Sequence, residues 1–368
     1  MFGRITGLGQ WFPEHVRRNS DWPEDFITAS RHRRGDRTLV DVGRKAGHAE
    51  SSVLKGDSAR CRTLVAKYLE LEKDDPFLGG SERRIVDPTT SSAEGEAHAA
   101  RQALDDAGQS AGEVDAVFSW ALVPDRLMPS NACHVARAVG ATRAWALTVD
   151  AACASPVLQL ALAAGLIESG RAKSVLLTQS HFASRTFPFS HPASPCVGDG
   201  ATAMLVTASR QPGLLFTHSV THGEYCDAVV WCRDKSADLD TPWWEPGGAC
   251  FMGSHDPEGT RTLIDETIGI GVATLRELAD RARFDVGRID VLASVQPRRW
   301  VPSAIAEGLG LPTRIAPQTY DRFAHLGGAG AVANLIAARD SGLMREGALA
   351  VMYAQGAGFT RAAAAFRW

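Results

Sequence analysis

The stretch Val149-Asp150-Ala151-Ala152-Cys153-Ala154-Ser155-Pro156 constrains the fold more than any other, because an apolar run ends there at small residues and a cysteine. Residues 145–149 before it have strand character, and residues 156–167 after it repeat apolar side chains at helical spacing. This order places Cys153 at a helix N-terminus, whose partial positive charge favours the reactive thiolate. We predict that Cys153 is a nucleophile and the most reactive thiol; a packed cysteine among small residues is the alternative.

Composition and charge narrow the class of protein. The 368 residues make about two average domains, and 45% of them are hydrophobic, enough to fill sizeable cores. The net charge of −3 is spread along the chain without a basic block, so neither nucleic acid nor a membrane surface is an expected partner. No apolar run reaches the roughly 18 residues of a membrane span, and the N-terminus lacks signal-peptide character. We expect a cytoplasmic enzyme.

Cysteine usage argues against structural cross-links and against metal. The seven cysteines are odd in number and none belongs to a CxxC pair, so we predict neither a disulfide framework nor a metal site. They are Cys61, Cys133, Cys153, Cys196, Cys226, Cys232 and Cys250.

The first part of the chain alternates helical and strand patterns. A charged, helix-prone segment at about 13–80 has apolar residues at helical spacing, and we interpret it as a helical cap insertion. The patterns then predict a helix over 91–107, a strand over 114–120 and a helix over about 130–139, which leads into the strand before Cys153.

The two halves of the chain are similar to each other. Three segments of the first half have counterparts in the second, namely 112–119 with 287–294, 168–177 with 343–352, and 198–206 with 356–362. Such duplication predicts two α/β halves, each a mixed sheet covered by helices, with 1–208 as the first half and 209–368 as the second. A site between two such halves is a natural ligand location.

Five motifs resemble the thiolase superfamily, specifically its ketoacyl-acyl carrier protein synthase III group. They are Glu82-Arg83-Arg84-Ile85, Pro129-Ser130-Asn131-Ala132-Cys133, Asp150-Ala151-Ala152-Cys153-Ala154, Gly198-Asp199-Gly200-Ala201 and Gly356-Ala357-Gly358-Phe359-Thr360. The resemblance implies a thiolase-like fold, layered α-β-α-β-α with a five-stranded mixed sheet in each half. It also implies that Cys153 takes an acyl group from coenzyme A or an acyl carrier protein, used as substrates rather than bound cofactors.

The same resemblance implies a homodimer. The segment Gln179 to Pro195 resembles the dimer-contact loop of the family, and we interpret its histidines, His181 and His191, as structural.

Two departures from the family pattern bear on the reaction. Members that form carbon–carbon bonds carry a His in a Pro-His-Gln-Ala-Asn stretch and an Asn in a His-Gly-Asn-Thr-Ser stretch, but Val295 and His325 stand at those positions here. Val295 cannot donate a hydrogen bond to an enolate. One His beside a Cys is sufficient when an alcohol or amine attacks the acyl-enzyme.

The His-Leu-Gly run at 325–327 also resembles a subgroup that esterifies or amidates natural-product intermediates. We therefore predict an acyltransferase of natural-product biosynthesis that passes the acyl group from Cys153 to a hydroxyl or amine. Decarboxylative condensation and an inactive partner subunit are the alternatives.

Further residues are candidates for supporting roles. His222 is the second choice for the base, and the N–H groups of Cys153 and Ala357 are candidates for the oxyanion hole. The run Arg298-Arg299-Trp300 could hold the phosphate and pantetheine of the donor, or be an exposed, cation-rich strand end. Trp243-Trp244 could wall an acceptor pocket or pack a long loop.

Overall fold

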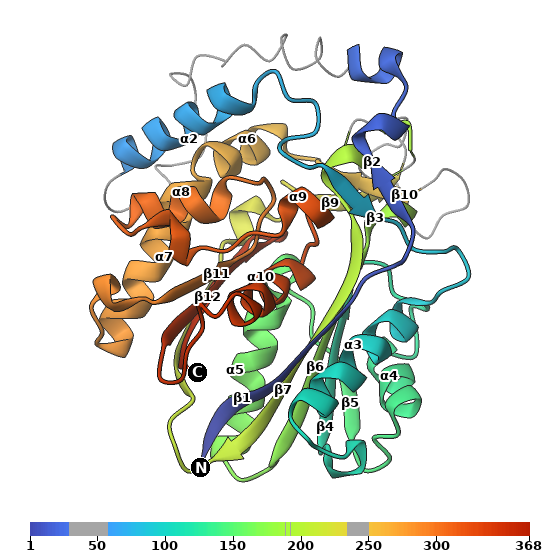
Figure 1. Cartoon of the computed structure of the whole chain (residues 1–368), viewed down its shortest axis with the longest axis vertical. Coiled ribbons are helices and arrows are strands. Elements are labelled where there is room, and N and C mark those ends of the chain that lie inside the picture. The colour runs from blue at the N-terminus through green and yellow to red at the C-terminus, as the bar shows by residue number, and fades with distance from the viewer. Residues whose placement is uncertain (29–57, 188, 192, 234–249) are drawn as a thin grey trace.

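The computed structural model describes residues 1–28, 58–187, 189–191, 193–233 and 250–368. Two main sheets lie side by side, with helices between them and on their outer faces (Figure 1). The first sheet contains, in spatial order, β1 (Phe2–Trp11), β7 (Asp199–Ser209), β6 (Ser174–Phe182), β4 (Ala116–Ala121) and β5 (Trp145–Thr148). β4, β5 and β6 are mutually parallel, whereas β7 runs antiparallel to β6 and to β1. This is the predicted mixed five-stranded sheet.

The second sheet contains β11 (Val291–Ser294), β12 (Leu349–Gly356), β13 (Thr360–Arg367) and β8 (Leu214–Thr221), in that order. The described residues thus supply four strands, one fewer than predicted. In the first half, β5 precedes the Cys153 turn, but the corresponding residues 316–319 before His325 form no strand. Pro317 has no N–H to give to a ladder, and the Thr319 N–H donates to the Gln296 side chain instead.

Helices complete the layers. α3 (Ser92–Asp106) and α4 (Asn131–Val139) cover the outer face of the first sheet, and α7 (Thr267–Ala282) and α8 (Val301–Gly308) cover that of the second. Between the sheets lie α5 (Ser155–Glu168) and α10 (Ala329–Asp340). The α-β-α-β-α arrangement expected of a thiolase-like fold is therefore confirmed.

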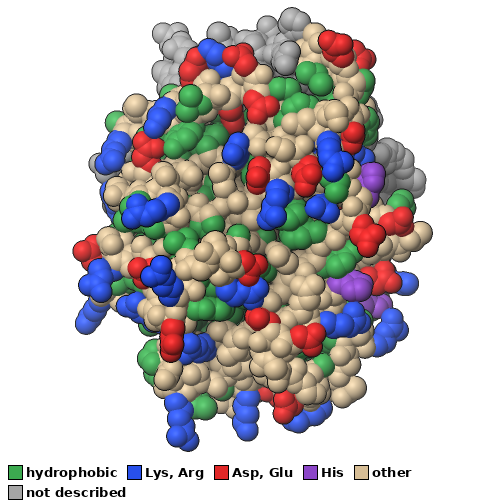
Figure 2. All heavy atoms as spheres, viewed as in Figure 1, with side chains coloured by type: hydrophobic (Ala, Val, Ile, Leu, Met, Phe, Trp, Pro, Cys, Tyr) green, Lys and Arg blue, Asp and Glu red, His purple; other side chains and the backbone are tan. Residues whose placement is uncertain are grey.

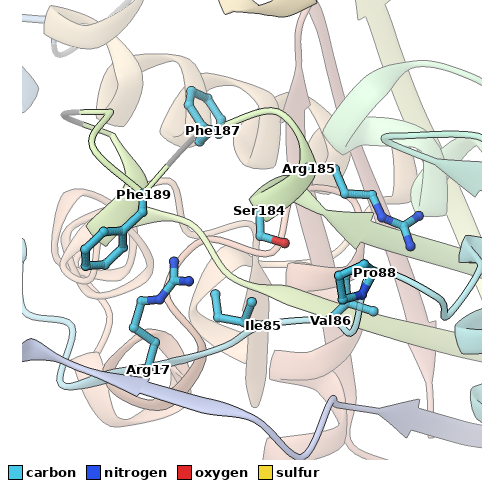
Figure 3. Close-up of a pocket in the computed structure, with 8 residues that line it drawn as sticks. All are labelled: Arg17, Ile85, Val86, Pro88, Ser184, Arg185, Phe187 and Phe189. Carbon is cyan, nitrogen blue, oxygen red and sulfur yellow. The ribbon is translucent and has the colours of Figure 1, made fainter. Parts of the chain in front are cut away.

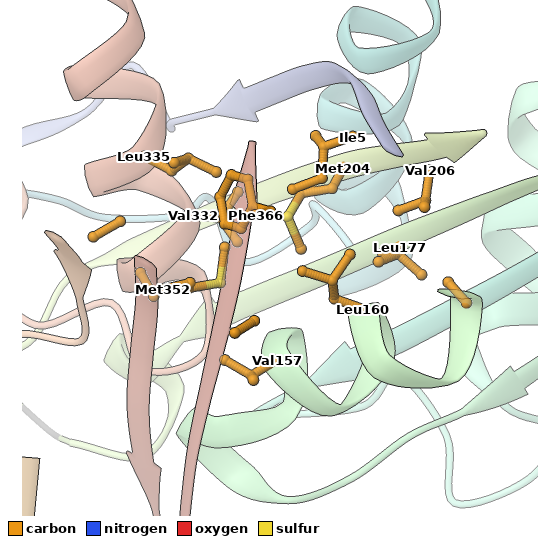
Figure 4. Close-up of a cluster of buried hydrophobic side chains, with 14 of the residues drawn as sticks. Ile5, Val157, Leu160, Leu177, Met204, Val206, Val332, Leu335, Met352 and Phe366 are labelled. Carbon is orange, nitrogen blue, oxygen red and sulfur yellow. The ribbon is translucent and has the colours of Figure 1, made fainter. Parts of the chain in front are cut away.

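The main hydrophobic core surrounds the two central helices. Both sheets contribute side chains to it, so the core joins the halves rather than filling each separately (Figure 4). Its members include Val157 and Leu160 of α5, Val332 and Leu335 of α10, Leu177 and Met204 of the first sheet, and Met352 and Phe366 of the second. Each such side chain contributes about 1.5–3 kcal/mol when fully buried.

Smaller elements surround the upper part of the molecule. β2 (Val16–Arg18) pairs with β3 (Glu82–Arg84), and β9 (Val230–Arg233) pairs with β10 (Cys250–Gly253). The short helices are α6 (Pro257–Asp265) and α9 (Tyr320–Phe323).

The predicted cap, about 13–80, is described on both sides of residues 29–57, which lie outside the described ranges, and its first part contributes the short strand β2. Its helix α2 (Ser58–Glu72) crosses above α7 and α8 (Figure 1). Cys61, Leu64 and Val65 of α2 are buried in a second core cluster with residues of both helices. The cap is therefore an integral part of the second half's packing.

The distribution of charged side chains on the surface agrees with the small, evenly spread net charge of the sequence. Figure 2 shows basic and acidic side chains interspersed over the visible face, without a large patch of one sign. Among the described residues, no helix combines the length and the apolar character needed to span a membrane.

Candidate active site

Cys153 lies on a tight turn between β5 and α5. The turn places Ala152 in the left-handed region, with φ of 49°, which is uncommon for a residue with a side chain. The Asp150 carboxylate stabilises the turn by accepting from the Ala152 N–H and from Trp120 Nε1, each at 2.9 Å. Ser155 adds a bond from its hydroxyl to the Ala152 carbonyl at 2.7 Å. These contacts fix the cysteine at the start of the central helix, as predicted.

His325 approaches from the second half, between α9 and α10. Its Nε2 lies 3.9 Å from Cys153 Sγ, and its Nδ1 lies 3.1 Å from the Gln296 carbonyl oxygen. A carbonyl oxygen only accepts, so Nδ1 carries the proton and Nε2 of the neutral ring is left with its lone pair. The structure thus brings together the two residues that sequence reasoning selected, in the orientation in which Nε2 can accept the thiol proton.

Burial determines the charge of this pair. It raises the pKa of the Cys153 thiol to about 12, with a smaller contribution from Asp150, and it lowers the pKa of His325 to about 4. Although Cys153 keeps some accessible surface, its sulfur is surrounded by protein atoms that replace water. At neutral pH the pair is therefore thiol and neutral imidazole.

Burial of the sulfur opposes the thiolate that the helix N-terminus is predicted to favour. That Cys153 is the most reactive thiol stays a prediction, and Cys133 and Cys226 are more exposed to solvent than Cys153.

The glycine-rich turn after β12 reaches the nucleophile through its backbone. A Cβ added at Gly356 would lie 2.1 Å from the Ala151 carbonyl oxygen and 3.1 Å from the nitrogen of Cys153. Only glycine permits this approach. It brings Ala357, the next residue, beside the Cys153 turn, and an oxyanion role for its N–H stays a prediction.

His222 has a different setting from that expected of a base. Its side chain is 7% exposed, and its Nε2 accepts from Arg361 Nε at 3.1 Å. Its Nδ1 lies 3.5 Å from Glu224, while its backbone N–H donates to the Phe359 carbonyl at 2.8 Å. Burial, and after it Arg361, lowers the pKa of His222. Because the Nε2 lone pair is already engaged, His222 supports the glycine-rich turn and is not free to accept another proton there.

The candidate donor-binding run contacts the cap. Arg298 forms an ion pair with Glu72 of α2, and Trp300 Nε1 donates to the same carboxylate at 2.9 Å. Arg299 packs against Gly79, where an added Cβ would lie 2.4 Å from its Cδ. Donor binding by these residues stays a prediction, and it must be reconciled with their contacts to the cap. Trp243-Trp244 lies outside the described residues.

Of the described residues at and beside the position of the family histidine, neither Val295 nor Gln296 offers a free side-chain donor. Val295 is 1% exposed and belongs to the central core. The Gln296 amide donates from Nε2 to Thr319 Oγ1 at 2.8 Å and accepts at Oε1 from Asn334 Nδ2 at 3.1 Å. Both ends of the Gln296 amide are thus engaged within the second half.

Sequence reasoning did not anticipate the position of His181. Its ring stands edge-on to the His325 ring, with centroids 5.5 Å apart and planes at 65°. The available signal was its position near the C-terminal end of a buried strand, where sites of α/β sheets gather.

A cavity of about 360 Å³ lies elsewhere, between the segment after β3 and the residues that follow β6 (Figure 3). Arg17 lines it and stacks on Phe189, with 4.7 Å from the guanidinium carbon to the ring centre. Neither Cys153 nor His325 lines this cavity.

Comparisons with known proteins agree with this geometry. Residues 147–223 match the family model of 3-oxoacyl-[acyl-carrier-protein (ACP)] synthase III, and residues 279–368 match the model of its C-terminal part. The β-ketoacyl-[acyl-carrier-protein] synthase III of Pectobacterium atrosepticum is 30% identical over the full length of both chains. The same enzyme from Xanthomonas campestris is 27% identical, covering 100% of this chain and 99% of its own.

Among solved structures, the 3-oxoacyl-[acyl-carrier-protein] synthase III of Aquifex aeolicus superposes with a TM-score of 0.75 at 22% identity, covering 100% of both chains. This likeness shows the shared fold. With a relative 30% identical along its whole length, the chain belongs to the 3-oxoacyl-[acyl-carrier-protein] synthase III family.

Proposed function

We propose that this protein is an acyltransferase, which loads an acyl group from a coenzyme A or acyl carrier protein thioester onto Cys153 and passes it to a hydroxyl or amine. The observation that carries the proposal is the pairing of Cys153 Sγ with the unprotonated Nε2 of His325 at 3.9 Å, without a second side-chain donor from Val295 or Gln296. The natural-product setting rests on the His-Leu-Gly resemblance.

The neutral state of the pair dictates the order of proton transfers. His325 Nε2 removes the Cys153 thiol proton as sulfur attacks the thioester carbonyl carbon, the carbon–sulfur bond of the donor breaks, and the departing thiol takes the proton back. The acceptor hydroxyl or amine then attacks the acyl-enzyme, giving its proton to His325, and Cys153 leaves with that proton. Each step uses only groups of this chain and the two substrates.

Decarboxylative condensation is the second candidate, and the activity for which the relatives are named favours it. It needs polar groups around the thioester oxygen while a carbanion forms, and a lost donor in an oxyanion site costs about 3 kcal/mol. The buried Val295 supplies none. Acyl transfer avoids this cost, because it needs only a proton acceptor near the attacking atom.

Carbon dioxide release separates the two candidates. The protein is first acylated at Cys153 with a panel of acyl thioesters and followed by intact mass, then given either a hydroxyl or amine acceptor or a malonyl thioester. We expect loss of the acyl mass with a matching ester or amide product, and no carbon dioxide. Decarboxylation in step with product formation would make the protein a condensing enzyme.

His325→Ala tests the base in the same assay. Because the resting thiol is neutral, both acylation and transfer should slow, each by about 10²- to 10⁴-fold. Val295→His combined with His325→Asn rebuilds the family pair. A gain of malonyl decarboxylation in that double variant would show that these two positions decide the reaction.

We include self-association as a homodimer in the proposal. Leu158, Leu162 and Leu166 form a stripe on the outward side of α5, where Leu162 is 49% exposed. The strand β5 lies at the edge of the first sheet, where 46% of Trp145 is exposed, and among the described strands it pairs with β4 alone. A second copy related by a two-fold axis could pair with this edge and cover the stripe.

The segment predicted for the dimer contact, Gln179 to Pro195, contributes less surface than expected, because residues 179–182 are buried within β6. Light scattering at micromolar concentration should give a dimer, and Leu162→Asp a monomer. Leu215→Asp is the control, since Leu215 is similarly exposed but lies on β8 of the other sheet. A wild-type monomer would contradict the dimer.

A further inference from the structure

The second histidine of the site, His181, has no role in the steps above. It lies near the end of β6, is 2% exposed, and stands 5.5 Å from the His325 ring. We propose that His181 is a positioning residue, which holds His325 in the orientation needed for proton transfer with Cys153. This inference rests on the proposed role of His325 as the base.

A chain of hydrogen bonds connects the two histidines. His181 Nδ1 donates to the Gly198 carbonyl at 2.9 Å, and the Gly198 N–H donates to the His325 carbonyl at 3.1 Å. The His325 N–H in turn donates to the Cys196 carbonyl at 3.0 Å. The backbone of His325 is therefore bound on both sides to residues 196–198, and His181 fixes the last peptide of that segment.

The segment after His325 is shaped to admit the His181 ring. Gly327 has a φ of 51°, and a Cβ there would lie 2.3 Å from His181 Cδ2 and 2.9 Å from its Nε2. A side chain at 327 would displace the ring, so the glycine and the imidazole fit each other. His181 thus contacts the base in three ways, through its ring, through Gly198 and through Gly327.

The neutral charge state of His181 is suited to a positioning role. The Gly198 carbonyl requires a proton on Nδ1, and burial and then the neighbouring His325 lower the pKa of His181 to about 3. Two acids beside this part of β6 are engaged elsewhere, since Asp199 accepts from Ser184 and the Val86 N–H, and Glu96 accepts from Ser180. A neutral His181 places no positive charge beside the proton that His325 must receive.

The test compares two substitutions of His181 by single-turnover acylation of Cys153 from an acyl-CoA, followed by intact mass. An asparagine amide can donate from nearly the same position as Nδ1, whereas phenylalanine keeps a flat ring but has no donor. We expect His181→Asn to acylate within about threefold of wild type and His181→Phe to be about 10- to 100-fold slower, because misplacement of about 1 Å can cost that much. The donor concentration for half-saturation should be unchanged in both.

Gly327→Ala, with Gly330→Ala as its control, tests the same support from the other side. Gly330 lies in α10 with only an ordinary contact to Leu326, so alanine there should leave acylation unchanged, while Gly327→Ala should slow it. This pair decides the question if His181→Phe does not fold.

Several outcomes overturn the positioning role. They are a folded His181→Phe that acylates at the wild-type rate, an asparagine variant no faster than the phenylalanine variant, or equal effects at Gly327 and Gly330. The proposed function fails differently, through a wild-type acyl-enzyme that does not pass its acyl group to a hydroxyl or amine.

Discussion

The central strands β6 and β12 occupy corresponding places in the two halves, yet they serve the reactive pair in different ways. β6 ends in the first half and brings the His181 side chain to His325, which belongs to the second half. β12 ends in the second half and brings the bare backbone of Gly356 to Cys153, which belongs to the first.

Each half therefore completes the functional residue of the other. The corresponding strand ends of the duplicated fold have therefore diverged. The end of β6 carries an imidazole ring that orients the base, whereas the end of β12 carries a glycine that lets the backbone approach the nucleophile. Loss of either contact should impair acylation, but for different reasons.

The largest effect should follow removal of the Cys153 thiol, the group whose acylation both contacts support. Cys153→Ala leaves no nucleophile, so no acyl mass should be added by any thioester, while the fold persists because alanine fits a turn of small residues. Intact mass after exposure to the donor panel measures this. Cys133→Ala is the control, because Cys133 is an exposed thiol. Acylation that survives in Cys153→Ala would remove the basis of the comparison.

The contact between β12 and the Cys153 turn can be broken without changing Cys153 or His325. Gly356→Ala would force a Cβ to within 2.1 Å of the Ala151 carbonyl, so the turn must move and acylation should fall by about 10²-fold. Gly112→Ala is the control, because a Cβ at Gly112 would meet only Ser110 Oγ, at an ordinary 3.7 Å. Normal acylation by Gly356→Ala would show that the close approach is dispensable.

The fall of kcat/KM for acylation at low pH tests the residue that β6 supports, because this fall reports the pKa of His325. His325 must be neutral to accept a proton, and its pKa of about 4 keeps it so well below the ordinary 6.5. The kcat/KM for acylation should therefore fall less than about twofold between pH 7.5 and 5.5, where an ordinary histidine would lose about tenfold.

The same shift has a cost in stability, which sets the conditions for that measurement. The folded pKa of His325 lies below the unfolded value, so the stability it contributes is present above pH 6.5 and is lost as the pH falls toward 4. Rates should therefore be taken well below the unfolding temperature. An acid limb centred near pH 6.5 would show that His325 is solvated in the working enzyme.

The smallest effect concerns Glu96, whose carboxyl group accepts hydrogen bonds from Thr178 and Ser180 of β6. Burial raises its pKa to about 7, against hydrogen bonds from Ser119, Thr178 and Ser180. A folded pKa above the unfolded value means that the contribution to stability is present below pH 4.5 and is lost as the pH rises through 7. Glu96→Gln cannot ionise.

Its Tm relative to wild type should therefore increase between pH 6 and pH 8, by about 1–2 °C if ionisation costs about 1 kcal/mol. Thermal unfolding at the two pH values measures this, with the exposed Glu168→Gln as the control. A Tm difference independent of pH would show that Glu96 does not change its charge between pH 6 and pH 8.

Much of the fold could be predicted because its signals are local. The helix expected over 91–107 is Ser92–Asp106, which begins at the capping box formed by Ser91 and Glu94. The strand, tight turn and helix around Cys153 also follow from neighbouring residues. The duplication then indicated the layers, and the motif position indicated His325.

What could not be predicted depends on contacts distant in sequence. The proximity of His181 to His325 arises from packing between the halves, and the thiol pKa of Cys153 depends on burial that no local pattern reports. The engagement of Arg298 and Trp300 by Glu72 likewise required knowledge of where the cap docks.

The shared core has a consequence for how the chain is made. The cluster around Leu160 of α5 is closed by Met352 of β12 and Phe366 of β13, although residues 169–348 separate the helix from those strands. At about 5–20 residues per second, a ribosome completes α5 roughly 10–40 s before it completes β12. During that interval the apolar helix has only one of its two sheets, so the nascent first half should be the stage at which this protein is most prone to aggregate and most dependent on chaperones.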